Sequence, residues 1–233
     1  MRPRPIARPA LAGALCFAFT CAAAESALAQ SDTVQTTPTP SATSAAKPRI
    51  GVRDRKTDVR AGTRAAVRGA VGAGGRSVKG LLVSLQVKRD GRWKPIDRDR
   101  TTRRGRYVLR ERVTRTGTTP LRVRVAAVPG VVRSEARRVG KLRVYRWAYA
   151  SWYGPGFYGQ RTACGQTLGY GTLGVAHKSL PCGSKVTFKK GRREVTVRVI
   201  DRGPFVGGRE YDLTGATARR LNFGGHGSVL ATR

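Results

Sequence analysis

Acidic side chains are scarce in this chain. Its 233 residues include 13 Asp and Glu against 46 Lys and Arg, which gives a formal net charge of +33. A large excess of positive charge attracts polyanions such as nucleic acid, anionic lipid or an anionic cell wall. The net charge does not choose among these partners, and it does not say which face of the protein is basic.

The chain also lacks an apolar run long enough to span a bilayer comfortably. The run over residues 10–24 follows an arginine-rich start and precedes Ala27-Leu28-Ala29, which has the pattern of a signal-peptide cleavage site. Residues 1–29 are therefore predicted to be a signal peptide, and an uncleaved N-terminal anchor is the alternative. We expect a secreted or cell-envelope protein with no transmembrane segment in its mature chain and no nucleic-acid partner.

Metal-ligating residues are few, with 2 His and 4 Cys. Cys16 and Cys21 lie within the predicted signal peptide, which leaves Cys164 and Cys182. No cluster of His and Cys surrounds them at zinc-ligand spacing, so no metal site and no cofactor is predicted. Because exported proteins keep their disulfides, we expect these two cysteines to be bonded, with two free buried thiols as the alternative.

Large apolar residues are nearly absent from residues 30–48, which are rich in Thr, Ser and Pro and are predicted to be a flexible linker. Residues 49–146 lack helical periodicity and show short alternating runs between turn signals. This pattern predicts a β-sandwich, and the segment resembles immunoglobulin-like or fibronectin-like modules. Trp93, which follows the hairpin signal Asp90-Gly91, is expected to pack in its core.

Most of the positive charge falls in residues 49–146, with 29 Lys and Arg against 7 Asp and Glu. The arginines mostly occupy alternate strand positions, so we expect them to face solvent. Two interpretations remain open: a solvated basic surface, or adhesion to an anionic wall polymer through many weak contacts.

Residues 147–233 combine aromatic residues, glycines and both remaining cysteines. A glycine-rich stretch over residues 154–171 is predicted to be a long loop. A short helix is predicted after Asp212, with Thr214 as its N-cap. Strands joined by glycine-rich crossings predict a small β-barrel. The predicted strands cover residues 148–153, 173–177, 184–188, 194–200 and 228–232.

Asp201 is the first candidate for chemistry. It follows the run Val195–Ile200, and strict alternation would place it on one face with Val195, Val197 and Val199. A carboxyl at the end of an apolar stripe is desolvated, which favours the protonated form that a general acid needs. The alternative is a structural residue that caps the following Gly203-Pro204 turn or pairs with Arg202.

Five short motifs follow one another in this part of the chain. They are Ala150-Ser151-Trp152-Tyr153-Gly154, Thr162-Ala163-x-Gly165, Ala176-His177-Lys178-x-Leu180-Pro181, Val199-x-Asp201-Arg202-Gly203-Pro204-Phe205 and Tyr211-Asp212-Leu213-Thr214. In this order they resemble the rare lipoprotein A family of double-psi β-barrels, which is related to expansins and barwin-like domains. The resemblance covers residues 147–233 and implies a six-stranded barrel.

This resemblance implies an action on peptidoglycan as a lytic transglycosylase, with Asp201 as general acid and base. Gln166 stands where the family pattern usually carries Glu, and an amide cannot transfer a proton in that role. The alternative is therefore a wall-binding, expansin-like module without catalysis. In either case peptidoglycan or another anionic wall polymer is the expected partner, and a monomer is expected.

The resemblance also suggests further site residues. Asp212 matches an acid of the expansin-like binding site, or it interacts with the helix N-terminus. His177 matches a histidine of the family's groove, although a lone histidine is more often structural. Side chains with a predicted substrate-binding role, some of which must instead fill the core, are Trp152, Tyr153 and Phe157, together with Gln166 and Arg202.

Overall fold

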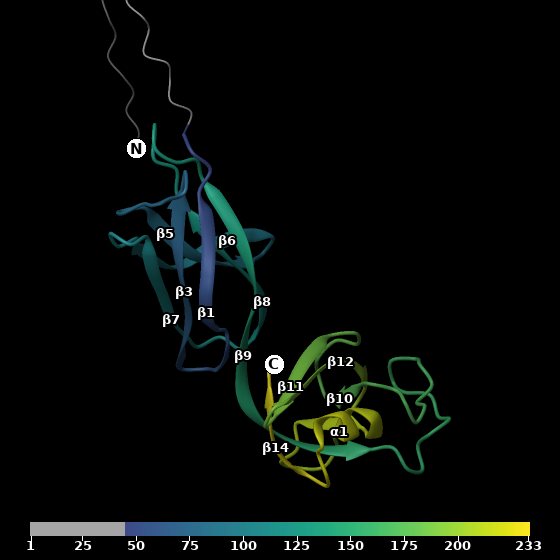
Figure 1. Ribbon diagram of the computed structural model, residues 1–233. Coiled ribbons are helices and arrows are strands. Elements are labelled where there is room, and N and C mark those ends of the chain that lie inside the picture. Colours follow the sequence, from purple (N-terminus) through teal and green to yellow (C-terminus); the bar gives the residue numbers. More distant parts are fainter. Residues whose placement is uncertain (1–44) are drawn as a thin grey trace, which may run out of the picture. The chain divides into compact units, whose positions relative to one another are not determined.

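The structure, a computed structural model, describes residues 45–233. The predicted signal peptide and most of the predicted linker lie outside these residues. Strands dominate the described chain and one short helix accompanies them (Figure 1), so the fold class is all-β, as predicted. Within residues 45–233 we find no helix with the length and apolar character needed to cross a membrane.

The N-terminal strands form a two-layer sandwich. One layer has the order β1-β3-β7, with β4 paired to the end of β3, and the other has the order β6-β5-β8-β9 (Figure 1). All these pairs are antiparallel, whereas β2 joins β9 in parallel. The strands are β1 (Arg49–Lys56), β2 (Asp58–Arg60), β3 (Thr63–Ala73), β4 (Arg76–Ser77), β5 (Leu82–Arg89), β6 (Arg92–Arg100), β7 (Arg106–Val113), β8 (Gly117–Val125) and β9 (Glu135–Tyr153).

Alternation along these strands builds the sandwich core. In β8, Leu121, Val123 and Val125 are buried, whereas Arg122 and Arg124 between them point away from the core. The buried stripes of both layers meet in one apolar cluster. Burial of this aliphatic surface is the main favourable contribution to folding, and it leaves the arginines at the surface, as predicted.

Trp93 does not pack in this core, contrary to the sequence-based expectation. It pairs with the exposed Lys88. Its side chain therefore projects from the outer face of the sheet, and Val87 projects from the inner face into the core. There it is half-buried beneath the guanidinium of Arg122, which lies 4.3 Å from the ring centroid. The hairpin was predicted correctly, but the register of its second strand decides which face Trp93 occupies.

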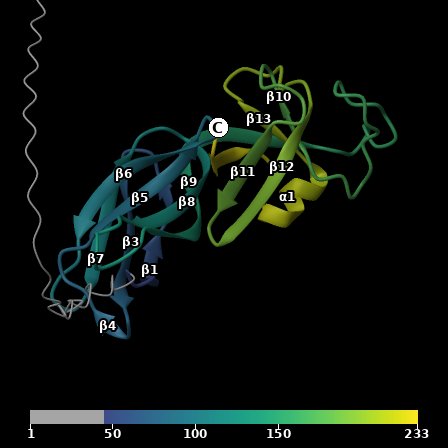
Figure 2. The same ribbon diagram turned by 90° about the horizontal axis from the view of Figure 1, so that it is seen from above.

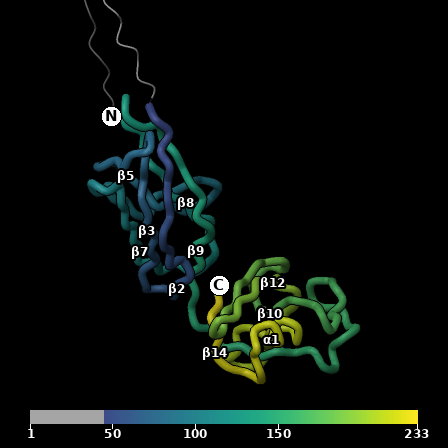
Figure 3. Tube along the Cα trace, in the orientation of Figure 1, coloured from purple at the N-terminus to yellow at the C-terminus, as the bar shows by residue number. Residues whose placement is uncertain are grey.

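The strand β9 is shared by the sandwich and the following barrel (Figure 3). Its first part pairs with β8, and residues 146–153 pair with β14 and β13. The strand predicted over residues 148–153 is therefore the end of a much longer one. Its first half escaped prediction because Arg137 and Arg138 interrupt the alternation expected of a strand.

Six strands close into a barrel, as predicted. The ring runs β9-β14-β11-β12-β10-β13 and returns to β9, with parallel pairs β10–β12 and β13–β9. The elements after β9 are β10 (Val175–His177), β11 (Lys185–Lys190), β12 (Arg193–Asp201), β13 (Tyr211–Thr214), the helix α1 (Gly215–Leu221) and β14 (Gly227–Ala231). The strand β13 was missed, because four residues next to a helix carry too short a pattern.

The helix α1 packs against β12 and β13 (Figure 2). Thr214 is its N-cap, as predicted, and its hydroxyl accepts a hydrogen bond from Thr217 N. The same hydroxyl donates to Thr172 O at 2.7 Å and accepts from Gly174 N at 3.2 Å. Thr214 therefore joins the helix start to the end of the glycine-rich loop inside a buried network.

Thr214→Ala should destabilise the barrel, because it leaves buried backbone groups without the hydroxyl they share. We expect a loss of about 1–3 kcal/mol in the free energy of unfolding, measured by urea denaturation followed by tryptophan fluorescence. Thr214→Ser keeps the hydroxyl and should lose much less. An equal loss in both variants would contradict the capping role.

Candidate active site on the outer face of the barrel

Strand register brings the two candidate carboxylates onto one face of the barrel. Ala176 on β10 pairs with Asp201 on β12 and, on its other side, with Asp212 on β13. Asp212 in turn pairs with Ser151 on β9. Because paired residues point to the same side of a sheet, these four side chains form a row across four neighbouring strands. The small Ala176 lies between the acids and is itself buried.

Asp201 reaches this face through a β-bulge. The pairing of β12 with β10 passes from Val199 directly to Asp201, so Ile200 is an extra residue. Strict alternation would have placed Asp201 on the inner face with the buried Val195, Val197 and Val199, as the sequence-based expectation had it. That expectation is wrong: the alternation ends at Val199, and the bulge turns Asp201 to the outer face beside Asp212.

The glycine at position 174 makes room for the bulge. A Cβ atom there would collide with the side chain of Ile200, which is itself buried. Gly174 also donates its N–H to the hydroxyls of Thr214 and Thr217. Two buried interactions therefore hold the backbone against which Ile200 packs.

Asp212 is half-buried, and burial raises the pKa of its carboxyl. The negative charge of Asp201 raises that pKa further, whereas Ser151 and Arg209 oppose the shift. The Ser151 hydroxyl donates to Asp212 Oδ1 at 2.8 Å. Asp212 therefore keeps its proton to a higher pH than an ordinary aspartate, which a proton donor near neutral pH requires.

Tyr153 supplies an unused donor at the same site. It lies two residues after Ser151 on β9 and so shares its face. Its hydroxyl is buried and has no hydrogen-bond partner among residues 45–233. Burial raises its pKa, and the charge of Asp201, a weak contact of the hydroxyl with the Asp201 carboxylate and then the charge of Asp212 add to the shift, so the phenol stays protonated close to both carboxylates. A buried hydroxyl without a hydrogen-bond partner destabilises the folded state unless a ligand supplies the missing acceptor.

Asp201 anchors the glycine-rich loop to the barrel. Its Oδ1 accepts hydrogen bonds from Ala163 N at 2.9 Å and from Arg202 N at 2.8 Å. Cys164 N donates to Ile200 O at 3.2 Å, and the predicted disulfide between Cys164 and Cys182 is confirmed, with Cα atoms 5.8 Å apart. Three links thus attach the loop beside the carboxylate.

Gln166 belongs to the same part of the loop. Its carbonyl accepts a hydrogen bond from Thr162 N at 2.8 Å, next to the residue that bonds Asp201, and the residue itself is exposed. The backbone therefore holds position 166 near the carboxylate row, while its side chain is accessible from solvent.

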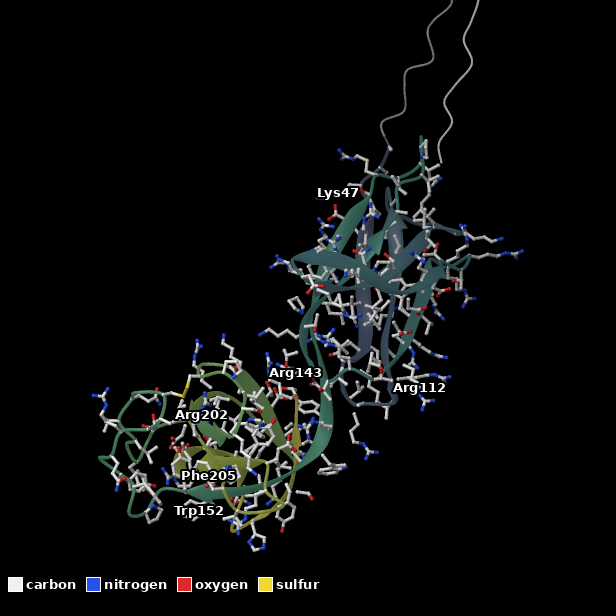
Figure 4. All side chains as sticks on the ribbon, turned by 180° about the vertical axis from the view of Figure 1, so that it is seen from behind. Lys47, Arg112, Arg143, Trp152, Arg202 and Phe205 are labelled. Atoms are coloured by element: carbon white, nitrogen blue, oxygen red, sulfur yellow. A yellow bond between two sulfur atoms is a disulfide. The ribbon has the colours of Figure 1, made fainter. Side chains whose placement is uncertain are left out.

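Arg202 is occupied by the protein itself. Its guanidinium donates to Leu180 O at 2.9 Å, to His177 O at 3.3 Å and to Cys182 Sγ at 3.3 Å. Figure 4 shows it beside the disulfide bond. It does not pair with the Asp201 carboxylate through its side chain, and these bonds tie the loop after β10 to the end of β12.

His177 does not join the carboxylate row. It pairs with the buried Tyr211, and the two ring centroids lie 5.0 Å apart. The His177 side chain therefore projects to the side of the sheet opposite to that of Asp212. Its Nδ1 accepts from Ser179 N and Leu180 N, which places the proton of a neutral ring on Nε2. Burial lowers its pKa, which favours that neutral form.

The aromatic candidates divide between two faces. Trp152 pairs with Leu213 and lies on the face of β9 opposite to Tyr153, where it lines a pocket of about 340 Å³ with residues of α1. Phe157 is 52% exposed and meets Tyr153 edge-on at 6.0 Å. Phe205 lies four residues after Asp201 and is 86% exposed (Figure 4), and the sequence had given it no predicted binding role.

The row can transfer protons and stabilise positive charge. Asp212 offers a proton, Asp201 offers negative charge beside it, and Tyr153 offers a hydrogen-bond donor close to both. Such pairs of carboxyl groups are what glycoside cleavage uses. In the part of the chain described, no group of three His, Cys, Asp or Glu residues is placed to hold a metal ion.

Residues 147–231 match the family model described as lytic transglycolase. Residues 147–231 form a domain of the RlpA-like double-psi β-barrel family. The relatives include the RlpA protein of Campylobacter jejuni, 49% identical over 75 residues, and that of Pseudomonas aeruginosa, 44% identical over 90 residues. Both are named endolytic peptidoglycan transglycosylase RlpA. A Synechocystis relative, 50% identical over 74 residues, is named as a probable enzyme of the same kind.

These matches cover 31%, 37% and 31% of this chain for the Campylobacter, Pseudomonas and Synechocystis relatives, respectively. The chain covers 27%, 26% and 23% of the length of those proteins, in the same order. The likeness therefore concerns about a third of this chain and about a quarter of each of these relatives.

Asp212→Asn should stabilise the protein near neutral pH. A carboxyl whose folded-state pKa is raised holds its proton in the folded state after the unfolded state has lost it, so stability falls as pH rises through that range. The variant lacks this loss, and its gain over the parent should be near zero around pH 4 and grow toward pH 7. Thermal unfolding at several pH values measures this difference.

Asp90→Asn is the matched control. Asp90 lies in an exposed hairpin turn at φ 51°, a conformation that Asn also accepts. It should show no pH-dependent gain. A gain for Asp212→Asn that does not change with pH would contradict the raised pKa.

Proposed function

We propose that the RlpA-like domain cleaves the glycan strands of peptidoglycan as a lytic transglycosylase. The observation that carries this proposal is the row of Asp201 and Asp212 on one face, with Ala176 between them and the unpartnered Tyr153 hydroxyl close by. The names of the relatives supply the substrate class. An exported, envelope-located protein follows from the predicted signal peptide.

The reaction needs two proton transfers and no water. A carboxyl donates its proton to the glycosidic oxygen as the bond from that oxygen to C1 breaks. The 6-hydroxyl oxygen of the same sugar then bonds to C1, and its proton passes to a carboxylate, which leaves a 1,6-anhydro sugar. Positive charge develops on the sugar between these events, and a nearby carboxylate stabilises it.

We assign the first transfer to Asp212, because burial keeps its proton available. Asp201 then stabilises the positive sugar and receives the proton of the hydroxyl. The sequence alone had assigned both transfers to Asp201, and that assignment stays a prediction. The neutral His177 takes no part in the chemistry proposed here, since its side chain projects to the side of the sheet opposite to that of the two carboxylates.

A non-catalytic, wall-binding module is the second candidate function. The observation that favours it is Gln166, because the family pattern usually carries Glu at this position and an amide cannot exchange a proton there. The loop is attached to the barrel by a disulfide and two hydrogen bonds, and such an attached loop also suits a rigid binding groove.

Mass spectrometry of digested peptidoglycan tests the proposed activity. The purified protein should release anhydro-muropeptides, and Asp201→Asn and Asp212→Asn should each lower the rate by about 10²–10⁴-fold, as expected when a general acid or base is lost. Asp90→Asn should retain the rate. Activity that survives Asp212→Asn but not Asp201→Asn would return both proton transfers to Asp201.

Gln166→Glu separates the two candidate functions. If the parent protein sediments with peptidoglycan and releases no product, while Gln166→Glu releases anhydro-muropeptides, the parent is a binding module that lost its acid. Comparable product from both proteins would show that position 166 is not needed for proton transfer. Gln166→Asn, which keeps an amide, is the control for a change in loop structure.

A further inference from the structure

The outer face of the sheet β6-β5-β8-β9 carries a cluster of arginines without acids. Gln86 on β5 pairs with Arg122 on β8, which pairs with Arg138 on β9. One step along the strands, Ser84 pairs with Arg124. Paired residues point to the same side, so these side chains share the face opposite to the sandwich core. We call Arg122, Arg124 and Arg138 the arginine face.

Arg122 is held in place by a buried polar network. Its guanidinium lies 4.3 Å from the centroid of Trp93, and its Nε donates to Gln86 Oε1 at 2.8 Å. Gln86, only 7% exposed, donates from Nε2 to the Ser84 hydroxyl at 3.1 Å. Stacking on an indole and a bond to a buried amide fix the guanidinium plane, so little side-chain entropy is lost when it binds a ligand.

The terminal nitrogens of Arg122 make no hydrogen bond to the described residues, although Nε does. They form the end of a planar fork that matches two oxygens of a carboxylate or phosphate. An oxyanion is therefore the ligand chemistry that fits.

The arginine face is not neutralised within residues 45–233. Arg68, Arg143 and Arg146 each form an ion pair with an Asp or Glu, whereas Arg122, Arg124 and Arg138 form none in that part of the chain. Desolvation lowers the pKa of Arg122, and the charges of Arg124 and Arg138 lower it further. Like charges held together without a counter-charge repel one another, and an anion would relieve that repulsion.

We propose that the arginine face binds an acidic polymer that carries oxyanions at repeated intervals, as phosphates or carboxylates. Neighbouring strands lie about 5 Å apart, so one chain of such a polymer can contact arginines of β8 and β9 at once. Trp93 is covered by Arg122 and is not free to stack on nucleic-acid bases, which favours an acidic polymer without bases. This proposal concerns the sandwich and does not depend on glycan cleavage.

Isothermal titration calorimetry of the full chain with two probes tests the proposal. Sodium polyphosphate represents phosphate oxyanions and polygalacturonate represents carboxylates, and the probe bound more tightly identifies the source of the oxyanions. The triple variant R122Q/R124Q/R138Q should weaken binding of that probe about tenfold or more, because several charge-assisted hydrogen bonds are lost together.

The control removes the same charge from the other layer. R64Q/R110Q/R112Q changes three exposed arginines on β3 and β7 and should weaken binding less than about threefold, because only long-range attraction is lost. Equal effects of the two triple variants would overturn the proposal and leave bulk charge as the cause.

Arg122→Lys tests the fixed guanidinium itself. The net charge is unchanged, but the fork, the stacking on Trp93 and the bond to Gln86 are lost, so binding should weaken about threefold or more. Unchanged affinity in this variant would overturn the positioned site. Tighter binding of duplex DNA than of either probe would also overturn the proposal. Asp201→Asn should bind both probes as the parent does, so a failure of the cleavage assay does not affect this result.

Discussion

The contact between Ile200 and Gly174 is the constraint on which the candidate site depends. A one-residue bulge changes the face of every side chain that follows it, and here the only acid at the end of β12 follows directly. Without Ile200 as the extra residue, Asp201 would enter the barrel core, where an unpaired charge is costly. A glycine backbone accommodates the displaced isoleucine, and the threonine network of α1 holds that glycine.

The candidate site combines a rigid floor with a loop attached at its edge. The floor consists of paired strands whose register fixes the row of side chains, so its geometry does not rely on long flexible segments. The loop carries Gln166, and it is fixed next to Asp201 by a disulfide and by hydrogen bonds. Such an arrangement presents polar groups with little entropy left to lose, which favours the binding of an extended polymer.

Much of this architecture could be predicted from the sequence, and the misses have physical reasons. Turn signals and alternation identified most of the strands, and an even pair of cysteines after a predicted signal peptide identified the disulfide. The bulge at Ile200 could not be predicted, because its cause is a glycine on a strand distant in sequence. For the same reason the sequence could not predict that His177 lies on the inner face of the barrel and Trp93 on the outer face of the sandwich. Both positions depend on strand pairings that no local pattern encodes. The raised pKa of Asp212 likewise depends on burial and on neighbours from β9, β12 and the loop before β13.

The strand β6 ends its sheet, and its composition has a consequence for a protein of this charge. An exposed edge offers unpaired backbone groups to other chains, which leads to aggregation when the edge is long and apolar. Here the edge carries Pro95, which lacks an N–H, next to Ile96, the extra residue of a register shift, and the exposed Arg92, Lys94 and Arg98 lie nearby. Another copy that approached this edge would meet like charge and an interrupted ladder. Part of the basic character of the sandwich therefore serves to keep separate molecules from joining their sheets.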